Sequence, residues 1–145
     1  MASTTRDLTE STLYRHWAKD KLRYCDTDRQ GHVSNIAFTM FCETGRVEFL
    51  LMPGASLAPA GSHFVIARLT LDFRGEMHWP GEVRIGTAVL ALGNSSFTLG
   101  QGIFVEDRCV ATAESVIVLA DTTTRRSTPL PEESRQRLSE YLPTA

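Results

Sequence analysis

Acidic and polar side chains crowd together in residues 24–35, YCDTDRQGHVSN, directly ahead of a long apolar segment. Asp28 is the residue best suited to chemistry, because a carboxylate can attack a carbonyl itself or take a proton from an attacking water. If a helix begins just after this loop, its free N–H groups and positive dipole end would stabilise the negative charge on an attacked carbonyl. The stretch is therefore a candidate site for acyl hydrolysis.

Three neighbours of Asp28 suit the same chemistry, and each also has an ordinary structural role. Gly31 removes a side chain where backbone must approach a ligand, and His32 and Asn35 offer hydrogen bonds to water, carboxylate or substrate carbonyl. On the other hand, Asp28 suits a loop or helix cap, His32 suits packing, and Asn35 suits a cap. Polar residues before a helix are common, so these residues alone leave both interpretations open.

A helix must follow the loop to position these groups. Apolar residues from residue 33 onward recur at helical spacing and predict a helix that is mostly buried. Ser34 or Asn35 would cap its first turn, and Pro53-Gly54 would end it. The apolar positions are Val33, Ala37, Met40, Val47 and Leu51.

The rest of the chain alternates with period two and predicts strands. In residues 67–75, ARLTLDFRG, apolar and polar residues alternate. Three further strands follow, near residues 82–92, 95–105 and 109–120, and a turn precedes each of them. Residues 14–24 form a weak first strand, and LPEESRQRLSEYL a short terminal helix. The fold class is therefore α+β: a curled antiparallel sheet of about five strands wrapped around one long buried helix. Residues 1–13 are expected to be a disordered tail, and 14–145 a single domain.

Composition narrows the classes of partner. A net charge of −2 over 145 residues gives no electrostatic reason to expect nucleic acid. No signal-peptide pattern occurs, and no apolar run approaches the roughly 20 residues that span a bilayer, so no membrane association is expected. The cysteines lack any CxxC spacing, which indicates free thiols in a reducing compartment, by default the cytoplasm. These are Cys25, Cys42 and Cys109.

No metal site is expected, because His16, His63 and His78 lie on different predicted elements and give no ligand spacing with Asp28. A thiol nucleophile made of Cys25 with His32 as base is less favoured than a small buried cysteine.

The motif itself resembles a known family. The sequence resembles the hot-dog-fold acyl-CoA thioesterases of the 4-hydroxybenzoyl-CoA thioesterase type. The resemblance lies in DTDRQGHVSN, followed by a helix carrying FCETGRVEFL, and the typical motif of the family is D-T-D-x-x-G-H-V-N-N. The likeness extends over residues ~15 to ~142. Two departures concern acyl specificity: Ser34 stands where asparagine is commoner, and Phe38 and Phe41 stand where tyrosines are frequent.

The resemblance implies roles for individual residues. Asp28 matches the family's catalytic carboxylate, which is either the nucleophile or the general base. Asp26 matches the first aspartate of the motif and is expected to hold the loop in place. The substrate is an acyl-CoA, with coenzyme A as part of the substrate and no other cofactor. The protein is implied to be a homodimer or homotetramer with the site at a subunit interface. Substrate contacts fall on Gly31, His32, Val33, Asn35 and Ser96, and the coenzyme A phosphates near Arg68 and Arg74.

Other interpretations remain open. Glu43 is a second candidate carboxylate, although an intrahelical pair with Arg46 is the simpler account. Trp79 suits turn packing or the rim of a ligand cleft. At the level of the whole domain, the alternatives are a module that binds acyl-CoA without turnover, a dehydratase or hydratase that depends on His32, and a purely structural dimer module.

Overall fold

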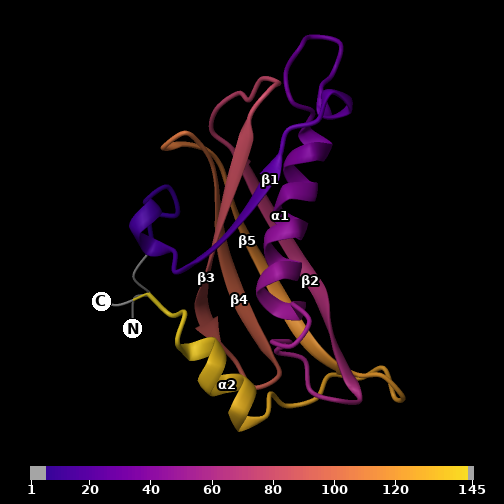
Figure 1. Ribbon diagram of the computed structural model, residues 1–145. Helices are drawn as coiled ribbons and strands as arrows, with labels where there is room; N and C mark the ends of the chain where they lie inside the picture. Colours follow the sequence, from indigo (N-terminus) through magenta and orange to yellow (C-terminus); the bar gives the residue numbers. More distant parts are fainter. Residues whose placement is uncertain (1–5, 144–145) are drawn as a thin grey trace.

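The computed structural model describes residues 6–143 and contains one five-stranded antiparallel sheet in the order β1-β3-β4-β5-β2. The strands are β1 (His16–Lys21), β2 (Ser62–Phe73), β3 (Glu82–Leu92), β4 (Ser96–Val105) and β5 (Arg108–Asp121). The long helix α1 (Asn35–Leu51) lies across one face of the curled sheet, and the short helix α2 (Glu132–Ser139) lies at one end (Figure 1). The expected α+β hot-dog arrangement is confirmed.

The start of α1 is set by its cap. Ser34 has extended backbone angles (φ −63°, ψ 147°), and its side chain accepts a hydrogen bond from the Ile36 N–H at 3.2 Å. Ser34 rather than Asn35 is therefore the N-cap, and its oxygen satisfies one of the helix's unpaired amides. The helix ends at Leu51, just before Pro53.

Gly45 lets α1 lie unusually close to the sheet. A Cβ at this position would lie 2.6 Å from Ile85 Cγ2 on β3 and 2.8 Å from Gln101 Nε2 on β4. Gln101 in turn donates hydrogen bonds to the Cys42 carbonyl (3.0 Å) and to Thr87 Oγ1 (3.2 Å). The helix is thus anchored to the sheet by a buried amide as well as by apolar packing.

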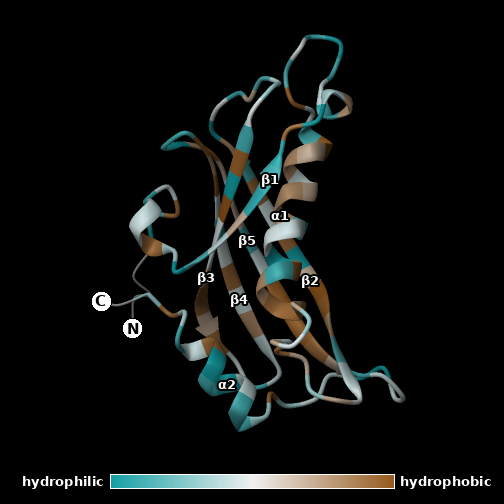
Figure 2. Cartoon of the chain, in the orientation of Figure 1, coloured by the Kyte–Doolittle hydropathy of each residue, from teal (hydrophilic) through white to brown (hydrophobic). Residues whose placement is uncertain are grey.

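The helix is buried on one side only, which corrects the prediction that it is mostly buried. Its apolar stripe Ile36, Met40, Val47 and Leu51 is 43–72% exposed. The physical reason is that a single sheet covers one side of a helix, and α1 lies beside β2, the edge strand. Strand β2 also carries exposed apolar residues. They are Val65, Ile66, Leu69 and Phe73. In Figure 2 both α1 and β2 include hydrophobic segments, coloured brown.

The N-terminal segment also differs from the expected tail. Residues 6–14 include the 3-10 turn η1 (Ser11–Leu13), and the Tyr14 hydroxyl donates to the Leu8 carbonyl. The Tyr14 ring packs where a Cβ of Gly86 would lie, on the face of the sheet away from α1. Residues 1–5 lie outside the described part of the chain.

Edge strand β2 begins at Ser62 rather than near Ala67. Its register against β5 shifts between Ile66 and Arg68, and such a bulge breaks the alternation on which the prediction rested. Within residues 6–143, no helix is long and apolar enough to cross a membrane.

The three cysteines are free, as expected. Cys42 is fully buried, and burial raises the pKa of its thiol to about 11. Cys25 is exposed, because it lies on the 3-10 turn η2 (Tyr24–Asp26) outside the core, and the prediction of a buried cysteine is wrong there.

Candidate functional site

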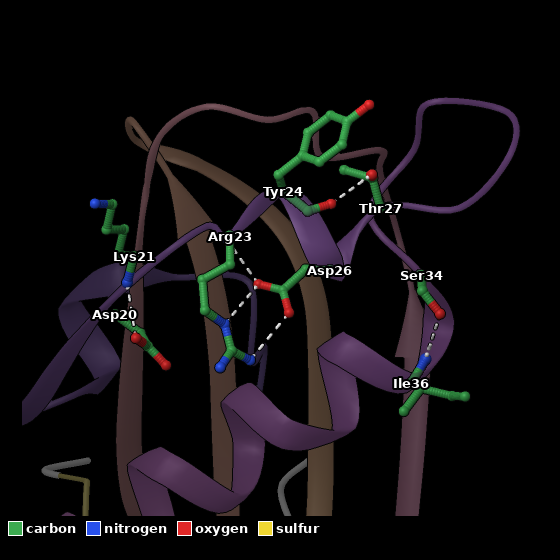
Figure 3. A network of polar contacts seen from close by, with 8 residues as sticks. All are labelled: Asp20, Lys21, Arg23, Tyr24, Asp26, Thr27, Ser34 and Ile36. Atoms are coloured by element: carbon green, nitrogen blue, oxygen red, sulfur yellow. Dashed lines mark hydrogen bonds and ion pairs between the residues drawn. The ribbon is translucent and has the colours of Figure 1, made fainter.

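Asp26 holds the base of the motif loop. Its side chain is buried and accepts hydrogen bonds from the Arg23 backbone N–H at 2.9 Å and from Arg23 Nη2 at 3.0 Å (Figure 3). Its carbonyl accepts from the Ser34 N–H at 2.8 Å, which closes the loop just before α1. The geometry agrees with the structural role expected for Asp26.

One carboxylate oxygen of Asp28 accepts hydrogen bonds from the backbone of its own loop. Oδ1 accepts hydrogen bonds from the backbone N–H groups of Gln30 (2.9 Å) and His32 (3.2 Å). The Asp28 N–H donates to the His32 carbonyl at 2.8 Å. Oδ2 accepts no hydrogen bond from any residue in the described range 6–143. The hydrogen bonds to Oδ1 therefore fix the orientation of the carboxylate, while Oδ2 is left free by the described residues to act on a substrate.

An open hollow of about 410 Å³ lies beside this carboxylate. The structure brings four of the predicted site residues to its wall: Asp28, His32, Val33 and Asn35. Gly31 lies in the adjoining turn, where its N–H donates to the Asp28 carbonyl at 3.1 Å. A Cβ there would meet no atom of the described chain within 4 Å, and the positive φ of 83° by itself favours glycine.

The backbone N–H groups of the motif loop from Gln30 onward and of the first turn of α1 almost all donate hydrogen bonds. From Gln30 to Ser34 each donates to Asp28, Met77 or Asp26, and those of Ile36, Ala37 and Phe38 donate to Ser34. Among the amides from Gln30 to Phe38, that of Asn35, the first residue of α1, is the exception: it has no hydrogen-bond partner among the residues described. Of the helix-end amides expected to stabilise an attacked carbonyl, the N–H of Asn35 is therefore the one left free by the described residues to donate.

Three predicted residues do not join this group within one chain. Ser96 pairs with Val118 on β5, whereas Phe73 at the hollow pairs with Ala111. Those β5 partners are seven residues apart, about 23 Å at 3.3 Å per residue. Ser96 therefore lies at the other end of the sheet.

Arg68 and Arg74 are exposed on β2 and just after it, on the face opposite Phe73, because side chains alternate along a strand. Arg74 Nε donates to Thr112 Oγ1 at 2.9 Å and lines a separate hollow of about 500 Å³. Neither arginine lines the hollow beside Asp28 in the chain described.

Glu43 and Arg46 are not an ion pair, which corrects the expected intrahelical contact: no salt bridge joins them in the part of the chain described here. Glu43 is exposed, whereas Arg46 is buried and lines a cleft of about 150 Å³ between α1 and β2. Burial lowers the pKa of Arg46, and its Nη1 is buried without a hydrogen-bond partner in the described range.

A second loop, between β2 and β3, completes the hollow, and sequence reasoning missed it. Phe73 contacts Phe38 edge to face (5.2 Å between ring centroids), and Gly75 and Glu76 line the wall beside Asp28. The Val33 N–H donates to the Met77 carbonyl at 2.9 Å and joins the two loops. Only the folded sheet makes these distant residues neighbours. Trp79, in the same loop, packs edge to face on Tyr24 (5.4 Å).

With this geometry in place, sequence comparison defines the class of protein. A family model for the Thioesterase-like superfamily matches residues 22–138, well over half of the chain, and the chain belongs to that superfamily. Among curated proteins, no match to the sequence is found.

Solved structures with the same fold support this assignment. The PA5185 protein from Pseudomonas aeruginosa is 25% identical, with a TM-score of 0.82 over 92% of this chain and 96% of its own. A predicted thioesterase from Bacillus stearothermophilus is also 25% identical, with a TM-score of 0.78 over 90% and 98%. A thioesterase from Thermus thermophilus, described as complexed with coenzyme A and zinc, is 27% identical, with a TM-score of 0.76 over 86% and 98%.

Proposed function

We propose that this protein is an acyl-CoA thioesterase of the 4-hydroxybenzoyl-CoA thioesterase type, which hydrolyses a thioester to a free acid and coenzyme A. One observation carries the proposal: the Oδ2 of Asp28 and the N–H of Asn35, neither of which is hydrogen-bonded within the described chain, belong to residues that line the same open hollow. A base or nucleophile beside an oxyanion donor is the minimum that acyl transfer requires. The family assignment supports the same reaction class.

Asp28 acts on the thioester carbonyl, directly or through water. In the water route its carboxylate removes a proton while the water oxygen bonds to the acyl carbon. The C–S bond then breaks, its electrons leave with sulfur, and the coenzyme A thiolate takes up the proton. The Asn35 N–H stabilises the carbonyl oxygen as negative charge develops on it. This chemistry requires no metal and no redox cofactor.

The two ends of the substrate have different surroundings. Phe38 and Phe73 give the hollow an apolar wall that suits an acyl group. The coenzyme A complex of the Thermus thermophilus relative supports coenzyme A as the thiol carrier here. Of the two arginines predicted for its phosphates, Arg74 is the closer in sequence to the hollow, directly before Gly75. Free cysteines suit a reducing compartment such as the cytoplasm.

A second copy of the chain is part of the proposal, because the hollow lies at the open edge of the sheet. Strand β2 is an edge strand, and its exposed apolar residues adjoin the exposed stripe of α1. Such a surface on a soluble protein marks an interface. Antiparallel pairing of two β2 strands would place the Phe73 end of one chain beside the Ser62 end of the other, so that a second subunit flanks the hollow.

The test is release of coenzyme A from a panel of acyl-CoAs by the wild type and Asp28→Asn. All proteins carry Cys25→Ser, because the exposed Cys25 thiol would react with a thiol-trapping dye. The amide keeps the shape of Asp28 but removes its charge and basicity, so activity should fall at least ~100-fold. Asp107→Asn, in the exposed β4–β5 turn, is the matched control and should keep full activity.

Each alternative has its own result. If Asp28→Asn releases thiol as fast as the wild type, Asp28 is a loop residue and Glu43 becomes the candidate carboxylate. If no variant releases thiol while acyl-CoAs raise the melting temperature, the chain is a binding module. Hydration or dehydration of an acyl-CoA releases no thiol and is measured separately; such an activity that survives Asp28→Asn but is lost in His32→Ala would favour the dehydratase or hydratase interpretation.

A further inference from the structure

Three side chains that the proposed hydrolysis does not require converge at the rim of the hollow: His32, Glu76 and His78. His32 Nε2 lies 3.4 Å from Glu76 Oε2, and His78 Nε2 lies 3.5 Å from the same oxygen. One ligand atom from each residue lies within 4.8 Å of the other two, and the two imidazole rings meet edge to face at 5.3 Å. The expectation of no metal site was based on spacing along the chain, which does not reveal this cluster.

The backbone explains why these three side chains face the same way. The hydrogen bond from the Val33 N–H to the Met77 carbonyl sets the two loops side by side. Val33 and Met77 are 4% and 1% exposed, so their side chains point into the core. Neighbours along extended backbone point to the opposite side. His32 on one loop, and Glu76 and His78 on the other, are therefore directed to the surface together.

The distances suit a metal better than hydrogen bonds. Both N···O separations exceed the roughly 2.7–3.2 Å of a good N–H···O bond. A tetrahedral ion with bonds of about 2.1 Å holds its ligand atoms about 3.4 Å apart. Two of the three ligand–ligand distances already have this length, and the partly exposed histidine rings have room to turn and shorten the third.

The donor set indicates which cation would bind. Two imidazole nitrogens and one carboxylate oxygen favour Zn²⁺ and its first-row neighbours over Mg²⁺ or Ca²⁺, which prefer oxygen. We propose that His32, Glu76 and His78 form a binding site for a divalent transition-metal cation of the zinc class. Three protein ligands leave the remaining coordination position to solvent or a ligand, the pattern of an open site. The proposal does not rest on thioester hydrolysis.

The experiment is a titration of untagged protein with Zn²⁺ in competition with a chromogenic chelator. The compared variants are Glu76→Gln and His78→Ala, with Glu133→Gln, an exposed glutamate on α2, as the matched control. Every protein carries Cys25→Ser, since an exposed thiol binds zinc by itself. A parallel titration uses Mg²⁺.

We expect one Zn²⁺ per wild-type chain and no competition from Mg²⁺. Glu76→Gln and His78→Ala should each bind at least about 100-fold more weakly, because even an outer-shell change typically costs about 10–100-fold. Zn²⁺ should raise the melting temperature of the wild type and of Glu133→Gln but not of His78→Ala. Glu76 and His78 are exposed, so melting without metal should be unchanged and should confirm that both variants fold.

Two results would overturn the site: a wild type that takes up no Zn²⁺ at micromolar concentrations, or Glu76→Gln and His78→Ala variants that bind it as tightly as Glu133→Gln. Neither result would bear on hydrolysis, which the release of coenzyme A measures separately.

Discussion

The backbone N–H of Asn35 and its side-chain amide can be tested separately. The proposed mechanism uses only the backbone N–H, which lies at the start of α1. Ser34 serves as the cap, and its side chain and carbonyl occupy the next three amides of α1. The Asn35 N–H is left as the donor for an oxyanion. A backbone group of this kind can be removed by one substitution only, proline.

We predict that Asn35→Pro lowers kcat for acyl-CoA hydrolysis by about 10²–10³, the usual effect of losing one oxyanion donor. Proline is favoured at the first position of a helix, where its missing N–H breaks no helical bond. The preceding residue must be extended, and Ser34 is (ψ 147°). The measurement is steady-state hydrolysis, with circular dichroism to verify the helix.

Asn35→Ala is the control, since it keeps the N–H and removes only the side-chain amide. Its kcat should stay near that of the wild type. Equal losses in Asn35→Pro and Asn35→Ala would assign the role to the side chain instead, and full activity in Asn35→Pro would remove this N–H from the mechanism.

The sequence predicts the part of the site that is contiguous in the chain. Asp28, His32, Val33 and Asn35 lie within one loop and the start of one helix, so local rules bring them together. Glu76 and Phe73 come from another strand and its following loop, and only strand order and register make them neighbours. Ser96 lies far from Asp28 within one subunit, because family-like order along the chain does not give the distance between two residues.

At the scale of the elements, the contact between α1 and the sheet depends on Gly45. Alanine normally stabilises a helix interior by about 1 kcal/mol relative to glycine. Here the added methyl would meet Ile85 and Gln101, which are 0% and 1% exposed and have no room to move away. Helix propensity and packing therefore predict opposite signs for the same substitution.

We predict that packing prevails and that Gly45→Ala lowers the free energy of unfolding by about 1–3 kcal/mol, the usual cost of overfilling a core. Chemical denaturation of both proteins measures it. Thr39→Ala, at an exposed position of the same helix, should be neutral or slightly stabilising. A Gly45→Ala protein as stable as the wild type would mean that α1 shifts away from the sheet at little cost.

Element types were predictable because each follows a local period, helical in α1 and twofold in β3, β4 and β5. Two properties of the elements were not. The start of β2 is hidden by the bulge near Ile66, and the exposed side of α1 cannot be told from its buried side when both are apolar. Val47 and Phe49 are equally apolar, yet one is 47% exposed and the other 6%.

At the scale of the whole molecule, one chain leaves an edge strand of twelve residues, Ser62–Phe73, unpaired along one side. Long, apolar edges normally pair with another strand. The exposed stripe of α1 lies beside this edge, and the cleft between them is lined by Arg46, whose Nη1 has no hydrogen-bond partner among residues 6–143. A second copy of the chain would cover the apolar residues and bring acceptors to Arg46.

We therefore predict that the wild type is at least a dimer in sedimentation experiments at micromolar concentration, and that Val47→Glu dissociates it by placing a charge in the apolar contact. Val47 lies about 18 Å along α1 from Asn35, at 1.5 Å per residue, so the substitution does not touch the hollow directly. Hydrolysis of acyl-CoA should nevertheless fall together with the dimer fraction if a second subunit flanks the site. Thr39→Glu adds the same charge on another exposed part of α1 and should keep both the dimer and the activity. A fully active Val47→Glu monomer would show that one chain holds the complete site, and a Val47→Glu dimer would place the interface elsewhere.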